Sequence, residues 1–498
     1  MQTPRALSLP LLLALAAPLP AVEGGVPTQL LLQRGEAFVA AFNAPGDAAL
    51  LAFARDHLER RVAAAGQAPR FVESVRRDFD LHGAFAAHRV QVLNDGKLAF
   101  VLARRARSGV WLNYQFRVHP EDEDRLQLVF VSLAVEPMER PTTPLGSAET
   151  RAWLDRFVDA METQQPFSGV AYAGRDGREL YSVVRGMAVA ETGERMTRAS
   201  RLNMASGSKL FTAVAVLQLD QAGKLSIDAP LATYLPDFPD RDWAASVTLR
   251  KLLTHTAGTG DYWDEEYERS WREITTTQQF LPHVLRHLRA SPIGEFSYSN
   301  SGFILLGLVI EAVAGESYYD YVRERIFEPA GMTATGYPLR SKREPGVAGA
   351  YRPEVRAGAV VPGTYLPLEL GERGSAAGGA ATTVDDLLRF VRALEEGRLL
   401  DAARFREMTR PQVAMGGSAG ESYGLGTSVR ERDGVLSWGH GGTARGTHFD
   451  LAVYPGLGVV TMVLSDYDTV GGFELAKAFD DLVRAAPPSP PRPPAPTR

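Results

Sequence analysis

The stretch MASGSKLF, residues 204–211, places two serines and a lysine at the start of an apolar segment. The chain continues as LFTAVAVLQLDQAG, whose apolar residues recur at helical spacing before a glycine stop, so a core helix is predicted. Ser206 and Lys209 lie three residues apart and share one helix face, whereas Ser208 points elsewhere. A lysine in such packed surroundings is costly unless it is used, so the pair predicts a nucleophile with its base. The alternative is the ordinary first turn of a buried helix.

Two further stretches carry groups that this chemistry needs. EFSYSNSG, residues 295–302, sets Tyr298 and Asn300 on a short loop before an apolar helix. We expect a phenolate near Lys209 that relays protons, and an amide that holds a substrate carbonyl; an ordinary helix cap with a packed tyrosine is the alternative. GHGGT, residues 439–443, is predicted to open an apolar strand, where its glycines permit close approach of a ligand backbone. A glycine-rich turn is the alternative there.

In this order the three stretches resemble the motifs of the serine β-lactamase and D-Ala-D-Ala peptidase superfamily, on its class C-type and esterase side. The Ser-x-x-Lys motif fits SGSK, the Tyr-x-Asn motif fits YSN, and the strand motif fits HGG. LLTHTAGTGDY from Leu252 and AAGGAATTVDDLLRF from Ala376 are also similar to the family. The resemblance spans roughly residues 150–485. It implies an α/β (α+β) β-lactamase/transpeptidase-like domain, an antiparallel sheet flanked by helices plus a helical region.

The resemblance also implies a site and a mechanism. Ser206 would attack a carbonyl, Lys209 coupled to Tyr298 would move its proton, and two backbone N–H groups would form the oxyanion hole. No metal or organic cofactor is implied. The implied site residues are Ser206, Lys209 and Tyr298 as catalytic residues, Asn300, His440, Gly442 and Thr443 as substrate-binding residues, with the N–H groups of Ser206 and Thr443 as the oxyanion donors.

The strand motif departs from that of many β-lactamases. His440 stands where they carry lysine, and Gly441 stands where they carry threonine or serine. The usual pair binds a substrate carboxylate by charge and hydroxyl, which a neutral imidazole and a glycine do not provide. Arg445 either supplies the missing charge or is a solvated surface arginine. We therefore expect an ester or amide hydrolase; the alternatives are a β-lactamase or D-Ala-D-Ala carboxypeptidase, and a non-catalytic binding protein on the same fold.

Two neighbouring stretches have structural interpretations. His255, in LLTHTAG, is predicted to be a structural histidine whose hydrogen bonds are satisfied. DYWDEEYERSW, from Asp261, is acidic and aromatic, and it is predicted to form a lid or pocket rim that sets specificity, or else a plain solvated loop.

Composition limits the partners. The 498 residues carry a formal net charge of -5, so no basic surface for nucleic acid is expected. The chain has no cysteine, which excludes disulfides, thiolate nucleophiles and zinc–thiolate sites. The expected partner is a small-molecule or peptide substrate, and the oligomeric state is left open.

The ends and boundaries of the chain follow from local composition. Residues 1–21 have Arg5 before a short apolar run, which predicts a signal peptide, a periplasmic or secreted protein, and no membrane span after cleavage. A retained anchor is the alternative. Residues 26–138 predict a small α+β domain of two helices and a four-stranded antiparallel meander, an order similar to nuclear-transport-factor-two-like domains. Residues 139–148 are predicted to be a linker, 149–485 the hydrolase-like domain, and 486–498 a disordered Pro-rich tail.

Overall fold

The structure of the chain is a computed structural model. It describes residues 28–58, 67–93, 98–107, 111–119, 122–134, 138–162, 166–342, 344–356, 359–365, 371–415, 420–467 and 471–485. The predicted signal peptide and the predicted Pro-rich tail lie outside the described residues.

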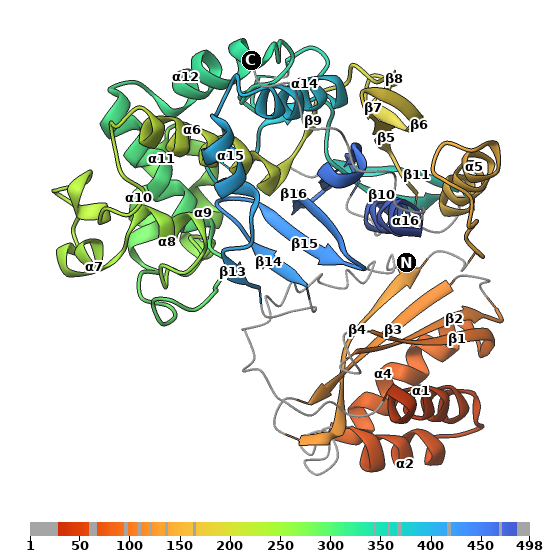
Figure 1. The fold of residues 1–498 in the computed structure, drawn as a ribbon. Helices are drawn as coiled ribbons and strands as arrows, with labels where there is room; N and C mark the ends of the chain where they lie inside the picture. The colour runs from red at the N-terminus through yellow and green to blue at the C-terminus, as the bar shows by residue number, and fades with distance from the viewer. Residues whose placement is uncertain are drawn as a thin grey trace.

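The N-terminal unit packs helices against a four-stranded antiparallel sheet (Figure 1). Its elements are α1 (Thr28–Asn43), α2 (Ala48–His57), α4 (Gln67–His82), β1 (Phe85–Leu93), β2 (Leu98–Arg105), β3 (Trp111–His119) and β4 (Asp122–Ala134), with the strands paired in chain order. The expectation of two helices is wrong, because α4 is a further one. Its sequence is dominated by polar and charged residues, and few apolar residues such as Val72 and Val75 mark its buried face. The small α+β unit itself is present.

The larger unit is built on an eight-stranded antiparallel sheet, in which the last strand of the chain pairs with the first strand of this unit. The strands in spatial order are β13 (Val413–Ala414), β14 (Glu421–Tyr423), β15 (Ser428–Arg432), β16 (Val435–Ala444), β17 (Thr447–Tyr454), β18 (Val459–Ser465), β5 (Gly169–Arg175) and β6 (Arg178–Arg185). β18 pairs with β5 through residues about 290 positions apart in the chain, from Val459 opposite Arg175 to Ser465 opposite Gly169. The first and last segments of this unit therefore fold together.

Helices cover both faces of the large sheet (Figure 1). α5 (Ala148–Glu162) and α16 (Gly471–Ala485) pack on one face. The other face and the adjoining helical region hold α6 (Lys209–Gln221), α7 (Arg241–Ser246), α8 (Leu249–Leu253), α9 (Glu265–Ser270), α10 (Leu281–Leu285), α11 (Asn300–Ala314), α12 (Tyr318–Val322), α13 (Glu328–Ala330), α14 (Val384–Glu395) and α15 (Ala402–Thr409). The remaining short strands are β7 (Met187–Val189), β8 (Glu194–Arg195), β9 (Leu202–Asn203), β10 (Tyr351–Arg356), β11 (Ala359–Tyr365) and β12 (Ala381–Thr382).

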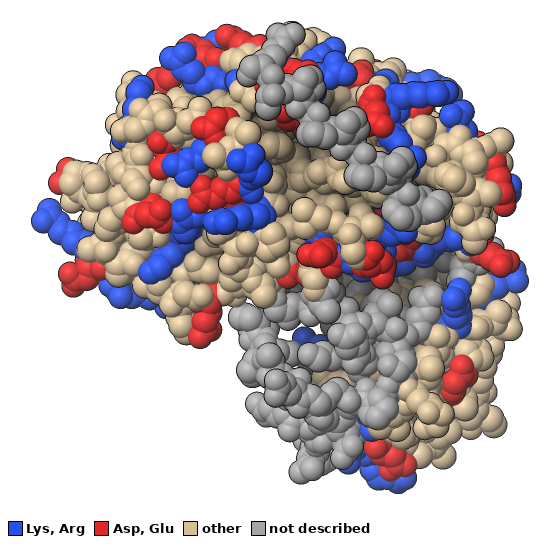
Figure 2. All heavy atoms as spheres, viewed as in Figure 1, with Lys and Arg blue, Asp and Glu red and all other residues tan. Residues whose placement is uncertain are grey.

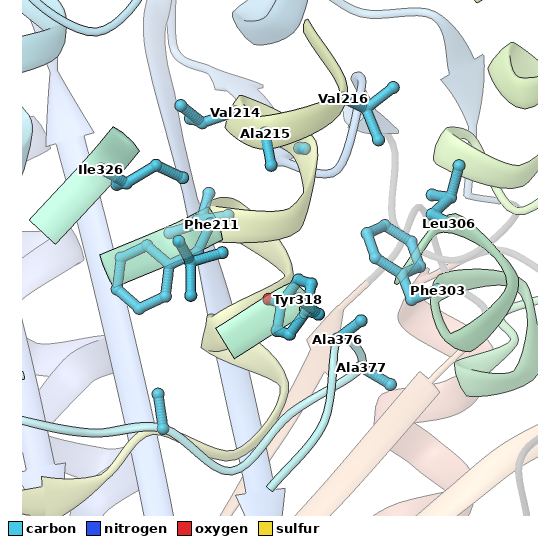
Figure 3. Packing of buried hydrophobic residues seen from close by; sticks show 14 of the residues in the cluster. Phe211, Val214, Ala215, Val216, Phe303, Leu306, Tyr318, Ile326, Ala376 and Ala377 are labelled. Carbon is cyan, nitrogen blue, oxygen red and sulfur yellow. The ribbon is translucent and has the colours of Figure 1, made fainter. Parts of the chain in front are cut away.

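Helix α6 is the centre of the larger core. Its side chains from Lys209 to Leu217 are all buried, and Figure 3 shows Phe211, Val214 and Val216 on turns of this helix among its neighbours. Burial of each such aliphatic or aromatic side chain contributes about 2 kcal/mol to the free energy of folding. A helix fixed so firmly gives the residues at its N-terminus a rigid position.

The segment predicted to be a linker is packed rather than free. Trp153 donates its indole N–H to the Glu139 carbonyl oxygen over 2.7 Å, and Arg140 forms an ion pair with Asp481 of α16. Met138 and buried Leu145 join the core beneath α5 and α16. The residues before α5 therefore form a strap along this outer face.

Charges of both signs are interspersed on the face shown in Figure 2. Within the described part of the chain, no one helix has the length and apolar character needed to cross a membrane. α11 and the helical segment 318–330 reach that length and apolar character only when taken together, and the chain bends by 83° between them.

Candidate active site

The turn that carries Ser206 is held in a strained conformation. A 3-10 turn spans Ala205–Ser208, and α6 begins at Lys209. Ala205 has φ of +40°, a region that favours glycine, and Asn203 stabilises it by accepting the Ala205 N–H over 2.8 Å. Ser206 is half-buried, whereas Lys209 is fully buried. The hydroxyl can therefore meet a substrate while the amine stays shielded from water.

The Lys209 amine makes three close contacts. Its Nζ lies 2.6 Å from Asn300 Oδ1, 2.6 Å from the Ala377 carbonyl oxygen and 3.1 Å from Ser206 Oγ. The first two atoms can only accept, so they take two N–H groups, and in the neutral amine the lone pair is left facing the serine hydroxyl. Burial lowers the pKa of Lys209 to about 7, against the charge of Asp261, which raises it. The amine is thus available as a base near neutral pH.

A loop over residues 375–380 delivers the Ala377 carbonyl oxygen. Thr212 donates its hydroxyl to the Ala376 carbonyl oxygen over 2.6 Å, and the Gly379 N–H donates to the Ala205 carbonyl oxygen over 3.1 Å. Figure 3 shows Ala376 and Ala377 on this coil, close to Tyr318. The loop is therefore tied both to α6 and to the turn that carries Ser206.

Tyr298 lies next to both catalytic candidates. Lys209 Nζ is 4.9 Å from the centroid of its ring. Burial raises the pKa of Tyr298 well above its usual value, and the nearby Ser206 side chain opposes this only in part. The expectation of a phenolate is therefore wrong for this site, because the desolvated oxygen keeps its proton. A neutral phenol is a proton donor.

Asn300 is held at both ends of its amide. Ser299 caps α11 by accepting the Gly302 N–H over 3.2 Å, which fixes Asn300 as the first residue of the helix. Its Nδ2 donates to Asp261 Oδ2 over 2.7 Å, while its Oδ1 accepts from Lys209. One N–H of the amide is therefore committed within the protein, and the predicted contact with a substrate carbonyl is left to the other.

β16 brings its glycines against the turn that carries Ser206. The strand begins at Val435, so the expectation that GHGGT opens it is wrong; the motif lies in its second half, before the two-residue turn into β17. A Cβ on Gly442 would lie 2.5 Å from the Met204 carbonyl oxygen and 2.9 Å from the Ser206 nitrogen. A Cβ on Gly441 would meet nothing nearer than 3.8 Å. Gly442 thus permits close approach of the strand to Ser206, and Thr443 follows it with an exposed side chain.

One edge of β16 is open beside this point. β15 pairs with β16 from Arg432 opposite Val435 to Ser428 opposite Gly439, and β17 pairs along the other edge to Ala444. Among the described residues, the edge beyond Gly439 has no partner strand on the β15 side. Backbone groups there are placed to meet an extended substrate.

His440 is neutral and held by its neighbours. The Tyr423 hydroxyl donates to Nε2 over 2.8 Å, and Nδ1 donates to the Gly441 carbonyl oxygen. Burial lowers the pKa of His440 to about 3, and the nearby Lys209 acts in the same direction. With both ring nitrogens engaged, the side chain offers no charge to a substrate. The geometry gives His440 an anchoring position rather than the predicted substrate-binding one.

His255 lies between the aromatic rings of this site. Its ring centroid is 4.2 Å from that of Tyr298 and 4.6 Å from that of Tyr423, and Nδ1 accepts the Ser299 N–H over 3.1 Å. Its buried Nε2 has no hydrogen-bond partner among the described residues. The prediction of a structural histidine with satisfied hydrogen bonds is thus correct for one nitrogen and wrong for the other.

Three contributors to the site do not stand out in the sequence. Asp261 is predicted only as the start of a rim, Tyr423 belongs to no motif, and the Ala377 carbonyl is a backbone group. The one available signal is that Asp261 lies within the family-like stretch LLTHTAGTGDY, and that likeness does not identify Asp261 as a partner for Asn300.

Comparison with known proteins gives a family and several relatives. The family model described as Beta-lactamase matches residues 154–484. Penicillin-binding protein 4 of Amycolatopsis lactamdurans is 30% identical over 379 residues, covering 68% of this chain and 94% of that protein. Esterase EstB of Burkholderia gladioli is 29% identical over 389 residues, covering 68% and 97%. The solved structure of a D-stereospecific amidohydrolase from Streptomyces sp. aligns with a TM-score of 0.54 and 27% identity, covering 66% of this chain and 98% of that one.

Proposed function

This chain belongs to the beta-lactamase family, and from that membership we propose that it is an exported hydrolase that cleaves an ester or amide through an acyl-enzyme on Ser206. The observation that carries the proposal is the fully buried Lys209 amine, which lies 3.1 Å from Ser206 Oγ with two acceptors on its other side. Relatives in this family are serine hydrolases, which include esterases, peptidases and amidases by name.

Acylation begins at the serine hydroxyl. Ser206 Oγ attacks the substrate carbonyl carbon as its proton passes to the lone pair of Lys209 Nζ. As negative charge develops on the carbonyl oxygen, this oxygen accepts hydrogen bonds from the backbone N–H groups proposed for this role, those of Ser206 and Thr443. Each such donor lowers the barrier by about 3 kcal/mol. The bare Gly442 lets the two donors converge.

Collapse of this intermediate needs a proton on the leaving group. The Tyr298 phenol donates its proton to the departing alkoxide or amine, and Lys209 returns the serine proton to Tyr298. Water then attacks the ester carbonyl carbon as Lys209 takes one of its protons. Lys209 passes that proton to Ser206 Oγ as the acyl–oxygen bond breaks, which releases the acid and the free serine. No net proton is gained or lost by the protein over the cycle.

The charges around the site favour neutral or amine-bearing substrates over anionic β-lactams. His440 is neutral, Gly441 has no hydroxyl, and Asp261 adds a carboxyl group beside Asn300. A substrate carboxylate would find no fixed cation in this strand motif. The relatives named esterase and D-aminopeptidase support esters and D-residue amides as the substrate class.

A D-Ala-D-Ala carboxypeptidase is the second candidate. It is favoured by the relative named Penicillin-binding protein 4, which the chain covers almost completely. It requires recognition of a terminal carboxylate, for which Arg445, just after β16, is the nearest cation in sequence.

The test uses labelling followed by a substrate panel. A fluorophosphonate probe should label the wild-type protein and not Ser206→Ala; equal labelling of both would reject Ser206 as the nucleophile. Nitrophenyl butyrate, a D-alanine nitroanilide, a chromogenic cephalosporin and a D-Ala-D-Ala peptide should then be compared by kcat/KM. We expect the first two to exceed the others at least tenfold, and a cephalosporin turned over fastest would overturn this ranking.

Export is tested separately. Arg5 and the apolar run after it support cleavage of a signal peptide near Ala21. Expression in a Gram-negative host should give a periplasmic protein whose intact mass corresponds to the chain without the predicted signal peptide, residues 1–21. A full-length mass in the cytoplasm would contradict export without affecting the catalytic proposal.

A further inference from the structure

We propose that Asp261 is a positioning residue that orients the Asn300 amide and thereby aims the Lys209 amine at Ser206. The inference rests on the proposed function, because it assigns Lys209 the part of the base.

The contacts form one continuous chain. Asp261 Oδ1 accepts the Tyr262 N–H over 2.9 Å, and Oδ2 accepts from Asn300 Nδ2 over 2.7 Å. Asn300 Oδ1 then accepts from Lys209 Nζ over 2.6 Å, and Nζ lies 3.1 Å from Ser206 Oγ. Each contact is short enough to be a well-formed hydrogen bond.

An amide needs such a partner because its two ends are nearly the same in shape. Rotated by half a turn, Asn300 would present N–H groups to Lys209 in place of an oxygen, and the amine would lose one of its two acceptors. An ionised carboxylate only accepts, so Asp261 permits a single orientation. With Ala377 supplying the other acceptor, the remaining position on Nζ is directed at the serine.

The same carboxylate acts on the charge of the base. Of the groups that face Lys209, His255 and His440 are neutral through burial and Tyr298 keeps its proton. Asp261 is the acid whose charge raises the pKa of Lys209, against the larger effect of burial. Burial raises the pKa of Asp261 as well, and its hydrogen bonds with Asn300 oppose that rise.

The position of Asp261 fits this role better than that of a free surface acid. It is half-buried, and the Tyr262 side chain that follows is buried. The exposed acids begin further along, in α9, where Glu265 and Glu268 face solvent. Glu268 therefore offers a matched control for the loss of one negative charge from the same segment.

The experiment compares Asp261→Asn, the exchange variant Asp261→Asn/Asn300→Asp, and Glu268→Gln with the wild-type protein, using a nitrophenyl ester. In Asp261→Asn we expect kcat to fall about 10- to 100-fold with KM within about threefold, as expected for a misaligned base. The acid limb of the pH profile should move about one unit lower, because a positive group loses a nearby opposite charge.

The exchange variant restores the donor and acceptor pattern in reverse. The amide introduced at position 261 would donate to one oxygen of the carboxylate introduced at position 300, whose other oxygen would accept from Lys209. We expect its kcat at pH 9 to exceed that of Asp261→Asn about tenfold or more, with an acid limb above that of the wild type, because the carboxylate now contacts the amine directly. Glu268→Gln should match the wild type in kcat and in the acid limb.

A different pattern would overturn the proposal. If Asp261→Asn raised KM for amine-bearing substrates and left kcat and the acid limb unchanged, Asp261 would be a substrate-binding group. NMR titration of lysine methylene carbons gives a readout independent of turnover, with Lys209→Met as the assignment control. The chain has few lysines: Lys97, Lys209, Lys224, Lys251, Lys342 and Lys477. If the pKa of Lys209 were unchanged in Asp261→Asn, the claim that the charge of Asp261 raises this pKa would be rejected. If Ser206→Ala still hydrolysed the ester, the proposed function itself would be rejected.

Discussion

At the scale of single residues, the chemistry depends on the protonation state of one amine. Lys209 is fully buried, yet its amine contacts polar atoms: the oxygens of Asn300 and Ala377, and the Ser206 hydroxyl, which its lone pair faces. Burial disfavours the ammonium more than the single carboxylate of Asp261 favours it, so the pKa falls. The same burial keeps Tyr298 protonated, which separates the base from the acid.

The first prediction concerns pH. Because the lowered pKa of Lys209 is about 7, kcat/KM for a neutral ester should rise with pH through about 7 and reach a plateau above about 8. The sign follows from the need for a free lone pair, which protonation removes below that pKa. Stopped-time assays from pH 5 to 9 measure the limb. A rate that falls as pH rises through 7 would show that the essential group acts in its protonated form.

A second prediction concerns the hydrogen bond that holds His440. Tyr423→Phe removes the donor to Nε2 and leaves a buried acceptor without a partner, so the free energy of unfolding should fall by about 1–3 kcal/mol. Urea denaturation followed by fluorescence measures this. Tyr181→Phe, which loses a hydrogen bond to Asp155 at the surface of the outer layer, is the control and should cost less. Equal stability of Tyr423→Phe and wild type would show that this bond does not hold the imidazole.

At the scale of elements, β16 and the turn before α6 must touch through backbone atoms. Gly442 lies where any side chain would meet the Met204 oxygen and the Ser206 nitrogen, whereas the neighbouring Gly441 has free space. Alternate residues of a strand face opposite sides, so the two glycines have different functions despite their shared motif.

The third prediction compares these glycines. Gly442→Ala should push the strand away from Ser206, lower kcat/KM at least about 100-fold by displacing an oxyanion donor, and destabilise the fold by about 1–3 kcal/mol. For Gly441→Ala we expect kcat/KM within about threefold of the wild type and a free energy of unfolding within about 0.5 kcal/mol, because its Cβ would meet no atom nearer than 3.8 Å. Steady-state kinetics and thermal melts on both variants provide the check. Two equally active variants would contradict the close contact.

Local spacing makes part of the site predictable. Ser206 and Lys209 lie on one short segment, so their juxtaposition needs only helical geometry. The contacts of Asp261 and Ala377 join residues far apart in the chain, and no local pattern encodes them. Helix α4 is not predicted because polar and charged residues together outnumber its apolar ones. The start of β16 is not predicted because the motif is defined by its glycines, and VLSW precedes them.

At the scale of the whole molecule, the described hydrophobic residues form separate clusters. One belongs to the small N-terminal unit, one lies under α5 and α16, and the largest surrounds α6. The strap from Met138 to Leu145 belongs to the cluster under α5 and α16. The general α/β architecture is predictable from the motifs, whereas the packing of this strap is not, because PTTPLGS has the composition of a flexible connection.

The fourth prediction follows from that packing. A chain that begins at Met138 should fold and hydrolyse esters within about threefold of the full chain, since the active-site contacts described here lie after that residue. A chain that begins at Glu149 should lose at least about 2 kcal/mol of stability, because Trp153 loses its acceptor and Leu145 is missing. Chemical denaturation of the two truncated proteins distinguishes them. Equal stability would show that the strap contributes nothing.

The three contacts of the lysine amine come from three different segments: the 3-10 turn just before its own helix, the helix that begins at Asn300, and the loop at Ala377. Loosening any one of them admits water and restores the ammonium, long before the eight-stranded sheet separates. Mild heating should therefore abolish ester hydrolysis reversibly, while the circular dichroism signal of the folded protein is unchanged. The rate of ester cleavage therefore reports local opening around Lys209. Mutations that stabilise only the sheet will not raise the temperature at which activity is lost.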